Sequence, residues 1–535
     1  MKKTVPEVTS NTEMVTISRA EYTSLLSELQ DLKEAYKKLD EKQQWLLEKL
    51  SSSTRKIYGT SSEKSSEIAL EQISFFNEAE LVASPVEEEP QTTEVSSYKR
   101  KRKSGNVKDV LPENIPVEVV EHRLPETELA CPTCETTMVE IGKTIRRTLV
   151  FIPAQAKIRE DIYYTYGCPK CNKEGTSTPI TKTPREACVL PGSYASPEAI
   201  AHIMTQKFAL GIPLYRQEQE LNRSGIMLSR QTMSNWILNS ADMWLKPIYE
   251  ELHRQLLQRE ILHADETTLQ VLHEDGKKAQ SKSYMWLYRT SGDTENPIVL
   301  FDYRPNRKAE NAIQFLDGFH GYLHTDGFPG YHKLPEDITV VGCWAHARRK
   351  FDDAVNVLPE KDRPDSLALQ GQVYCSKLFA LEKKWADLSP EERYIKRLEQ
   401  AKPVLDAMLS WANTHTAAPK SKLGIALHYL KEQWPYLTSY LKDGRLEISN
   451  NRAERSIKAF VIGRKNFLFA NTPNGAEGSA LTYSIIETAK ENGLDPFRYL
   501  TWVFTMAPEL SQLDTDWAKH FTPACAPDAC KSMAT

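Results

Sequence analysis

Hydrophobic positions near the start of the chain recur with a seven-residue period. Two registers, offset by three residues, fill the a and d positions of four heptads within 18–50: Tyr22, Leu25, Leu29, Leu32, Tyr36, Leu39, Gln43, Leu46 and Leu50. A single surface helix packed on its own domain could carry the same stripe. Four unbroken heptads with charged residues between them favour a coiled coil, whose use would be self-association into a homo-oligomer.

In the second half of the chain, short apolar and alternating runs predict strands. Three of them occur in succession, followed by a helix, a strand, a short connection, a strand and a second helix. This is the order of a ribonuclease-H-like fold, in which the first and fourth strands are neighbours. The predicted elements are strands at 261–272, 284–288 and 298–301, a helix at 309–316, strands at 322–327 and 338–343, and a helix at 345–351.

A turn followed by a capped helix lies between 191 and 258. The turn contains glycine and leads to Ser229, which is suited to cap the helix that begins at Arg230. This helix opens with polar side chains, including Arg230, Gln231 and Asn235, that suit contacts in the major groove of DNA. An ordinary helical hairpin would show the same pattern, and the sequence alone favours neither interpretation.

These patterns predict a multidomain α/β protein. The strand-rich core is interrupted by a stretch with helix starts and no strand pattern, which we interpret as an all-helical insertion. The expected segments are a coiled coil (18–50), a polar and basic linker (51–108), a zinc ribbon (109–190), a helical module (191–258), the core (259–353 and 448–475), the insertion (354–447), a C-terminal helical cap (476–510) and a tail (511–535).

Composition narrows the class of protein. Hydrophobic residues make up 40% of the chain and charged residues 26%, an ordinary soluble balance. No apolar run approaches the roughly 18 residues of a membrane span and no signal-peptide core is evident, so we expect a cytoplasmic protein without a membrane partner. The net charge of −4 gives no overall sign of nucleic-acid binding. Five cations at 99–103 are either a solvated linker or a contact to the phosphate backbone.

Four of the cysteines form two tight pairs. Cys131 and Cys134 are separated by two residues, and so are Cys168 and Cys171, each pair having proline after its first cysteine. One such pair could be redox-active or incidental. Two pairs with strand-like sequence between them predict a zinc ribbon, whose four sulfurs close a structural site for one Zn²⁺ ion.

Three acidic residues occur in contexts suited to one metal site. Asp265 lies in the middle of the first predicted strand, where a carboxylate is costly to bury, although a lone aspartate there is usually solvated or hydrogen-bonded. Asp326 ends the fourth predicted strand, and the ribonuclease-H-like order would bring it beside Asp265. Glu454 lies in the first turn of a later helix with an asparagine cap, and would be the third ligand.

Further side chains near these acids have several possible roles. His263 and His324 each precede an aspartate by two residues and share its face of the strand. The sequence leaves three roles open for them: orienting the carboxylates, contacting DNA phosphates, or packing as ordinary core histidines. Cys343-x-x-His346 could be half of a metal site, but no second pair is evident, so we favour a structural role or a DNA contact. Cations suited to DNA-backbone contacts are Arg348, Arg349, Lys350, Arg452, Arg455, Lys458, Arg464 and Lys465.

From the heptads to about residue 505, the chain resembles a DDE-type insertion-sequence transposase of the sixty-six family. One position departs from the pattern of this family: residue 328 is phenylalanine where we expect tyrosine, a change that should be tolerated. Besides the four cysteines, the matching pieces are Asp265-Glu266-Thr267, Thr325-Asp326-Gly327, Cys343–Phe351 (CWAHARRKF), Asn450–Arg455 (NNRAER), Gly463–Asn466 (GRKN) and Gly211–Arg216 (GIPLYR).

The resemblance implies that Asp265, Asp326 and Glu454 form a catalytic triad, for which we expect two Mg²⁺ ions. The expected protein binds the terminal inverted repeats of its element and catalyses cleavage and strand transfer of double-stranded DNA, at the element ends and the target. The family suggests that accessory proteins of the same element take part. The alternative is a DNA-binding repressor with an inactive nuclease-like core, and the presence of all three acids favours the enzyme.

Overall fold

The computed structural model describes residues 18–33, 156–167, 180–184, 186–292 and 295–532. The chain divides into two compact units, Met1–Ile57 with Arg185–Thr535, and Tyr58–Pro184. In the described part of the smaller unit, β1 (Thr165–Gly167) pairs antiparallel with β2 (Ile180–Lys182). The polar linker and the four paired cysteines lie outside the described residues.

Near the N-terminus, residues 19–33 form a helix, as the heptads predict. Its a and d side chains Leu25, Leu29 and Leu32 are 54%, 49% and 73% exposed. Such an exposed apolar stripe is what one strand of a coiled coil presents to a partner. Residues 34–50 lie outside the described residues, so the coiled coil itself stays a prediction.

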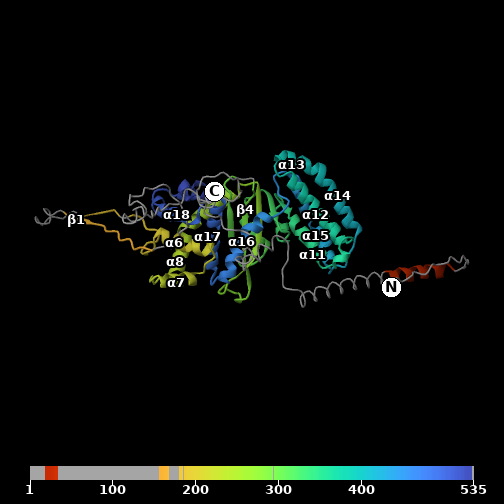
Figure 1. Cartoon of the computed structure of the whole chain (residues 1–535), viewed down its shortest axis with the longest axis horizontal. Helices are drawn as coiled ribbons and strands as arrows, with labels where there is room; N and C mark the ends of the chain where they lie inside the picture. The colour runs from red at the N-terminus through yellow and green to blue at the C-terminus, as the bar shows by residue number, and fades with distance from the viewer. Residues whose placement is uncertain (1–17, 34–155, 168–179, 185, 293–294, 533–535) are drawn as a thin grey trace, which may run out of the picture. The chain divides into compact units, whose positions relative to one another are not determined.

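The core of the larger unit is a five-stranded mixed sheet (Figure 1). Its strands are β3 (Ile261–Gln270), β4 (Lys282–Thr290), β5 (Val299–Arg304), β6 (Gly321–Thr325) and β7 (Ile338–Gly342). They lie in the order β5-β4-β3-β6-β7, with β3, β4 and β5 antiparallel and β3, β6 and β7 parallel. All five predicted strands are present, and the first and fourth are neighbours, as predicted.

Helices connect and flank this sheet. They are α10 (Ala309–Phe315), α11 (Trp344–Asn356), α16 (Asn451–Phe467), α17 (Pro473–Glu491) and α18 (Pro496–Leu510). The helices predicted after the third and fifth strands are α10 and α11. α16 packs against β3 and β4, and α17 packs against β5. The sheet thus positions α16, the helix that contains Glu454.

The edge strand β5 is completed by side chains of α17. The Val299 N–H donates to Thr488 Oγ1 at 3.0 Å, and the Phe301 N–H donates to Ser484 Oγ at 2.7 Å. These hydroxyls satisfy strand amides that would otherwise be buried and unpaired. The first half of the segment expected as a C-terminal cap is therefore built into the core.

The helical module before the sheet contains the helix start predicted at Ser229 and a second one at Ser196. Its helices are α6 (Pro197–Met204), α7 (Leu214–Arg223), α8 (Arg230–Ser240) and α9 (Lys246–Leu256), with π-helical turns at Thr205–Ala209 and Ala241–Leu245. Ser196 Oγ accepts the Ala199 N–H at 3.1 Å, and Ser229 Oγ accepts the Thr232 N–H at 3.1 Å. Both serines are therefore N-caps.

Between α11 and α16 the chain is helical and contains no strand, as predicted for 354–447, all of which the structure describes. Its elements are the 3₁₀ turn Glu360–Asp362, α12 (Leu367–Lys384), α13 (Pro390–Lys396), the π turn Arg397–Ala401, α14 (Lys402–Thr414), α15 (Lys422–Leu437) and the 3₁₀ turn Ser439–Lys442. No described helix of the chain is both long and apolar enough to cross a membrane.

A buried arginine ties this insertion to the segment that leads into α16. The Arg397 side chain is 1% exposed and pairs with Glu382 at 2.7 Å. It also donates to the carbonyl oxygens of Tyr440, Asp443 and Leu446 at 2.9, 2.7 and 2.7 Å. A buried charge with this many acceptors fixes the path of the chain just before Glu454.

Candidate active site

The parallel pairing of β3 and β6 brings the two predicted aspartates together. His263 is opposite His324 in the register, and Asp265 and Asp326 each follow two residues later. Burial raises the pKa of Asp265 well above its usual value, and the carboxylates of Glu266, Asp326 and Glu454 raise this pKa further. The structure therefore brings Asp265, Asp326 and Glu454 within electrostatic reach of one another.

Backbone amides orient both aspartates. The Glu266 N–H donates to Asp265 Oδ1 at 2.8 Å, and the Phe328 N–H donates to Asp326 Oδ1 at 2.9 Å. In each carboxylate one oxygen is held by the backbone, which leaves Oδ2 as the oxygen available to a further ligand.

The positive charge around these acids is unevenly distributed. Arg307 lies 3.9 Å from Asp326 Oδ2, and Arg349 lies 3.5 Å from Glu454 Oε2. Within the described part of the chain, no lysine or arginine pairs with Asp265. Asp265 is thus a buried carboxylate beside other acids and without a cation of its own. A bound metal ion would stabilise the charged form of such a carboxylate.

Asn450 fixes the start of α16 against β3. Its Nδ2 donates to the Ala264 carbonyl at 2.7 Å, and its Oδ1 lies 3.0 Å from His263 Nδ1. Asn450 occupies the N-cap position, as predicted, but its side chain makes no capping hydrogen bond because it is used in these contacts. Since Ala264 precedes Asp265, the contacts couple the position of Glu454 to that of Asp265.

The two histidines form a buried stack. The rings of His263 and His324 are 4.3 Å apart and nearly parallel, and both side chains are fully buried. The Glu447 N–H donates to His324 Nε2 at 3.3 Å. Burial lowers the pKa of His263 to about 3 and that of His324 well below its usual value. They are neutral core residues, and their burial is incompatible with a contact to DNA phosphates.

Glu266 is a buried acid that the sequence analysis did not single out. Its side chain is 0% exposed; Tyr331 Oη donates to it at 2.6 Å and Arg307 Nε at 2.6 Å. Burial and Asp326 raise the pKa of Glu266, against the effects of Tyr331 and Arg307. The adjacency of Asp265 and Glu266 was the available signal. The partners of Glu266 come from a loop (Arg307) and from the 3₁₀ turn Tyr331–Lys333, which no local pattern identifies.

Cys343 and His346 both lie beside Glu454. His346 Nδ1 is 3.6 Å from Glu454 Oε1, and Cys343 Sγ accepts the Asn450 N–H at 3.2 Å. Burial lowers the pKa of His346, although Glu454 and Asp326 oppose this effect. The sequence alone leaves the roles of these residues open, and the structure places them at the start of α11, facing α16.

The polar residues predicted to contact DNA through α8 are on its surface. Arg230, Gln231 and Asn235 are all exposed in the first half of the helix. Gln231 Nε2 donates to Asn235 Oδ1 at 3.1 Å, and Arg230 Nε lies 4.0 Å from Glu218 of α7. The three side chains are thus exposed on one helix, and their contact with DNA stays a prediction.

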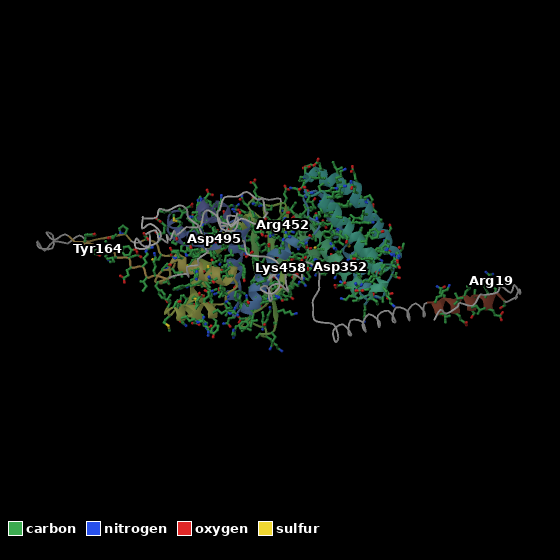
Figure 2. The ribbon with its side chains drawn as sticks, viewed as in Figure 1. Arg19, Tyr164, Asp352, Arg452, Lys458 and Asp495 are labelled. Carbon is green, nitrogen blue, oxygen red and sulfur yellow. The ribbon has the colours of Figure 1, made fainter. Side chains whose placement is uncertain are left out.

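Of the predicted DNA-contacting cations on α11 and α16, Arg464 also contacts the sheet. Its Nη1 donates to the hydroxyls of Thr267 and Thr268 at 3.2 and 3.1 Å, so the half-buried side chain anchors α16 to β3. Arg452 and Lys458 are on the same helix (Figure 2). The others are Arg348, Arg349 and Lys350 on α11, and Arg455 and Lys465 on α16.

The raised pKa of Asp265 predicts a pH-dependent loss of stability. An acid whose pKa is higher in the folded than in the unfolded chain stabilises the fold below the unfolded value of about 3.9, and this stabilisation is lost as pH rises through the folded pKa. In zinc-loaded protein kept free of other divalent ions, Asp265→Asn should therefore melt a few degrees above the unmodified protein at pH 8. Scanning calorimetry should show this difference shrinking at pH 5; a variant that melts lower at pH 8 would contradict it.

Removal of the Asn450 side chain should destabilise the fold. Asn450→Ala leaves the Ala264 carbonyl and a ring nitrogen of His263 buried without their partner, which costs about 1–3 kcal/mol. The neighbouring Asn451 provides a matched control, because its Oδ1 has no hydrogen-bond partner within the described part of the chain, and Asn451→Ala should cost less than about 0.5 kcal/mol. Urea unfolding of both variants measures the difference; equal costs would show that the Asn450 contacts are not important.

The chain matches several models of one protein family. A model described as "Transposase IS66 family" matches residues 192–478, and one described as "IS66 C-terminal element" matches 484–516. The "zinc-finger binding domain of transposase IS66" matches 128–172, which includes all four paired cysteines and supports a structural zinc ion. A fourth model, "Transposase C of IS166 homeodomain", matches 45–120.

Relatives of similar length are found in Sinorhizobium fredii. The uncharacterized protein y4hP is 29% identical over 473 residues, which cover 83% of this chain and 82% of the relative. The uncharacterized protein y4jD is 30% identical over 411 residues, which cover 73% and 78% of the two chains. Because the transposase model spans more than half of the chain, and the zinc-finger and C-terminal models flank it in order, the chain belongs to the IS66 family of transposases.

Proposed function

We propose that the chain binds the terminal inverted repeats of its insertion sequence and catalyses divalent-metal-dependent DNA cleavage and strand transfer, with Asp265, Asp326 and Glu454 as the catalytic acids. The observation that carries this proposal is geometric: the parallel register of β3 and β6 places buried Asp265 beside Asp326, and the Asn450 contact to Ala264 holds the start of the Glu454 helix against β3. The strand order β5-β4-β3-β6-β7 supports a ribonuclease-H-like assignment for the core.

The acids fit two Mg²⁺ ions. Mg²⁺ prefers carboxylate oxygens, and Asp265 and Asp326 each have one oxygen already oriented by a backbone amide. Asp265, Asp326 and Glu454 would hold the ions. When bound, the ions supply Lewis-acid polarisation of phosphate oxygens and a water of lowered pKa.

The chain's own residues bind and orient the DNA. Cleavage adds water to a phosphodiester and breaks the bond from phosphorus to its 3′ oxygen, which leaves a 3′-OH. That hydroxyl then attacks a target phosphodiester and displaces the target's 3′ oxygen. Neither step needs a covalent bond between protein and DNA. The triad acids would hold the divalent ions beside the reacting phosphate, and cations of α11 and α16 bind the backbone of the strand.

Other parts of the chain support binding and assembly in this proposal. Arg230, Gln231 and Asn235 of α8 enter the major groove, and Arg348, Arg349, Lys350, Arg452, Arg455, Lys458 and Lys465 contact phosphates. The exposed heptad positions of 19–33 support a homo-oligomer formed through the coiled coil. Accessory proteins of the same element would act with this oligomer.

An end-cleavage assay separates this proposal from the repressor alternative. The full chain is incubated with labelled duplexes that contain an element end or a shuffled end, with Mg²⁺, with Mn²⁺ or with neither. We expect nicked product with the element end and either ion, and none without divalent ions. Specific binding of the element end without cleavage under any condition would favour a repressor with an inactive core.

A further inference from the structure

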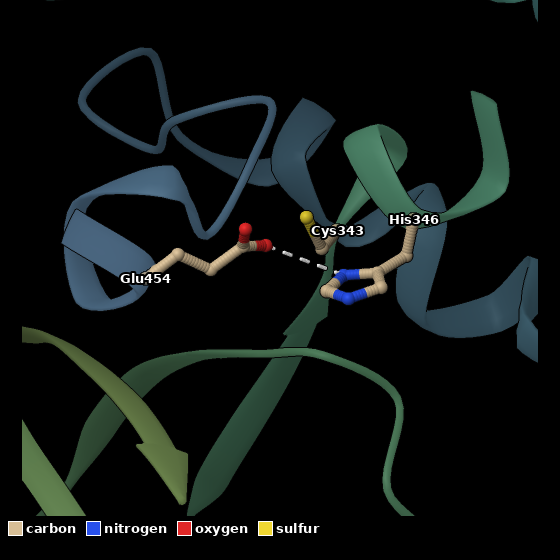
Figure 3. A group of neighbouring side chains, drawn as sticks. All are labelled: Cys343, His346 and Glu454. Carbon is tan, nitrogen blue, oxygen red and sulfur yellow. Dashed lines mark ion pairs between the residues drawn. The ribbon is translucent and has the colours of Figure 1, made fainter. Parts of the chain in front are cut away.

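Three potential metal ligands gather where α11 faces α16. Cys343 precedes α11, His346 is in its first turn, and Glu454 is in the first turn of α16. Their ligand atoms all lie within 4.8 Å of one another. Figure 3 shows the imidazole of His346 and the carboxylate of Glu454 pointing toward each other, with the Cys343 thiol beside them. This group shares only Glu454 with the three-acid site.

The facing atoms of His346 and Glu454 lack hydrogen-bond partners. Both His346 Nδ1 and Glu454 Oε1 are buried, and among the described residues neither has a hydrogen-bond partner; each is the other's ion-pair neighbour. They are 3.6 Å apart, which is too long for a hydrogen bond. Two ligands bound to one ion at about 2.0–2.4 Å are separated by roughly 3.0–3.6 Å. The gap therefore has the size expected of two ligands that share a cation.

A surface pair of the same kind shows that proximity alone would be weak evidence. His428 Nε2 lies 3.4 Å from Glu432 Oε2 on α15, but these side chains are 74% and 64% exposed. Water can satisfy both of those groups. The His346 and Glu454 side chains are 24% and 21% exposed, and their facing atoms are buried. The His346–Glu454 pair therefore differs from the surface pair, because its facing atoms are buried and have no hydrogen-bond partner among the described residues.

We propose that His346 supplies a nitrogen ligand to the divalent ion held by Glu454, which makes His346 a fourth metal-binding residue. This inference rests on the proposed function, because it takes Glu454 as a metal ligand. A site that mixes imidazole nitrogen with carboxylate oxygen suits Mn²⁺ or another transition ion better than an all-oxygen site does.

Cys343 has a different role in this arrangement. Its Sγ accepts the Asn450 N–H and so helps to fix the start of α16. Thiolates select softer ions than those that carboxylates favour. We therefore assign Cys343 to positioning the helix of Glu454, and not to the ion.

Electron spin-echo envelope modulation of bound Mn²⁺ tests the assignment without measuring activity. Mn²⁺ is added to the zinc-loaded full chain in the absence of DNA, and modulation from ¹⁴N reports a nitrogen ligand. We expect this modulation in the unmodified protein and in the control His428→Gln. His346→Gln should lose it and bind Mn²⁺ about tenfold more weakly or worse. Retention of the nitrogen modulation in His346→Gln would overturn the inference.

A labelling experiment covers the case in which His346→Gln fails to fold. Unmodified protein grown with ¹⁵N-histidine should change the modulation from the ¹⁴N to the ¹⁵N pattern, which identifies a histidine ligand without any substitution. An unchanged or absent nitrogen pattern overturns the inference. His346 is the histidine whose ring faces Glu454, whereas His263 and His324 are in the buried stack.

Two further variants separate failure of this inference from failure of the proposed function. Asp265→Asn and Glu454→Gln should each weaken Mn²⁺ binding strongly. If both bind Mn²⁺ as the unmodified protein does, the three-acid site is wrong and the histidine inference fails with it. If both lose Mn²⁺ while His346→Gln keeps the nitrogen modulation, only the histidine inference fails.

Discussion

Asp265→Asn should lower the rate of strand cleavage at element ends by at least about a thousandfold, equivalent to roughly 4 kcal/mol of transition-state stabilisation. The substitution keeps the shape of the side chain and removes the charge at the centre of the acid cluster. Because Asp265 contributes no DNA contact in this proposal, affinity for the element end should change little. Single-turnover cleavage with saturating Mg²⁺ and a gel-shift measurement on the same duplex give the two quantities.

Asp302→Asn is the matched control for this prediction. Asp302 is a half-buried acid in the same sheet, its pKa is raised to about 6 by burial, and it pairs with Arg304 on β5. It belongs to no part of the proposed site, so its substitution should leave cleavage within a few-fold of the unmodified rate. Cleavage by Asp265→Asn at a comparable rate would remove Asp265 from the mechanism.

The double substitution Cys131→Ser and Cys168→Ser should abolish binding of the structural zinc ion. Each change removes one thiolate from a different Cys-x-x-Cys pair, so neither pair remains intact. Structural zinc sites contribute apparent binding energies of about 10–16 kcal/mol, and small zinc domains unfold without the metal. The expected result is one fewer zinc ion per chain by atomic absorption, with rapid proteolysis between residues 109 and 190.

Cys525→Ser controls for thiol loss, because Cys525 is an exposed cysteine of the tail. It should keep full zinc occupancy and the proteolysis pattern of the unmodified protein. Zinc occupancy that survives the double cysteine substitution would show that the ribbon prediction is wrong.

The fold of the core could be predicted from local patterns. The strands have regular alternation or short apolar runs with clear ends, and their order restricts the possible neighbours. The proximity of Asp265 and Asp326 followed from the pairing of the first and fourth strands. Glu454 was harder to place, because a long helical insertion precedes it and only its position in a first turn marked it.

The features that local patterns did not predict are mostly contacts between residues far apart in the sequence. Glu266 is bound by Arg307 from a loop and by Tyr331 from a short 3₁₀ turn, and neither segment has a periodic signal. Asn450 looked like a helix cap, but its side chain binds β3 and a histidine, so local propensity was overridden by a distant contact. The contact of Arg464 with β3 was also missed, since charge alone does not show that a side chain folds back onto a strand.

A crystal structure of the chain with element-end DNA and Mn²⁺, with the ions located by anomalous scattering, tests the central claim most directly. We expect Mn²⁺ bound at about 2.0–2.2 Å from carboxylate oxygens of Asp265, Asp326 and Glu454, next to the phosphate at the end of the element. Ions bound elsewhere on the DNA-bound chain, or bound beside the aspartates with Glu454 turned away from them, would contradict it.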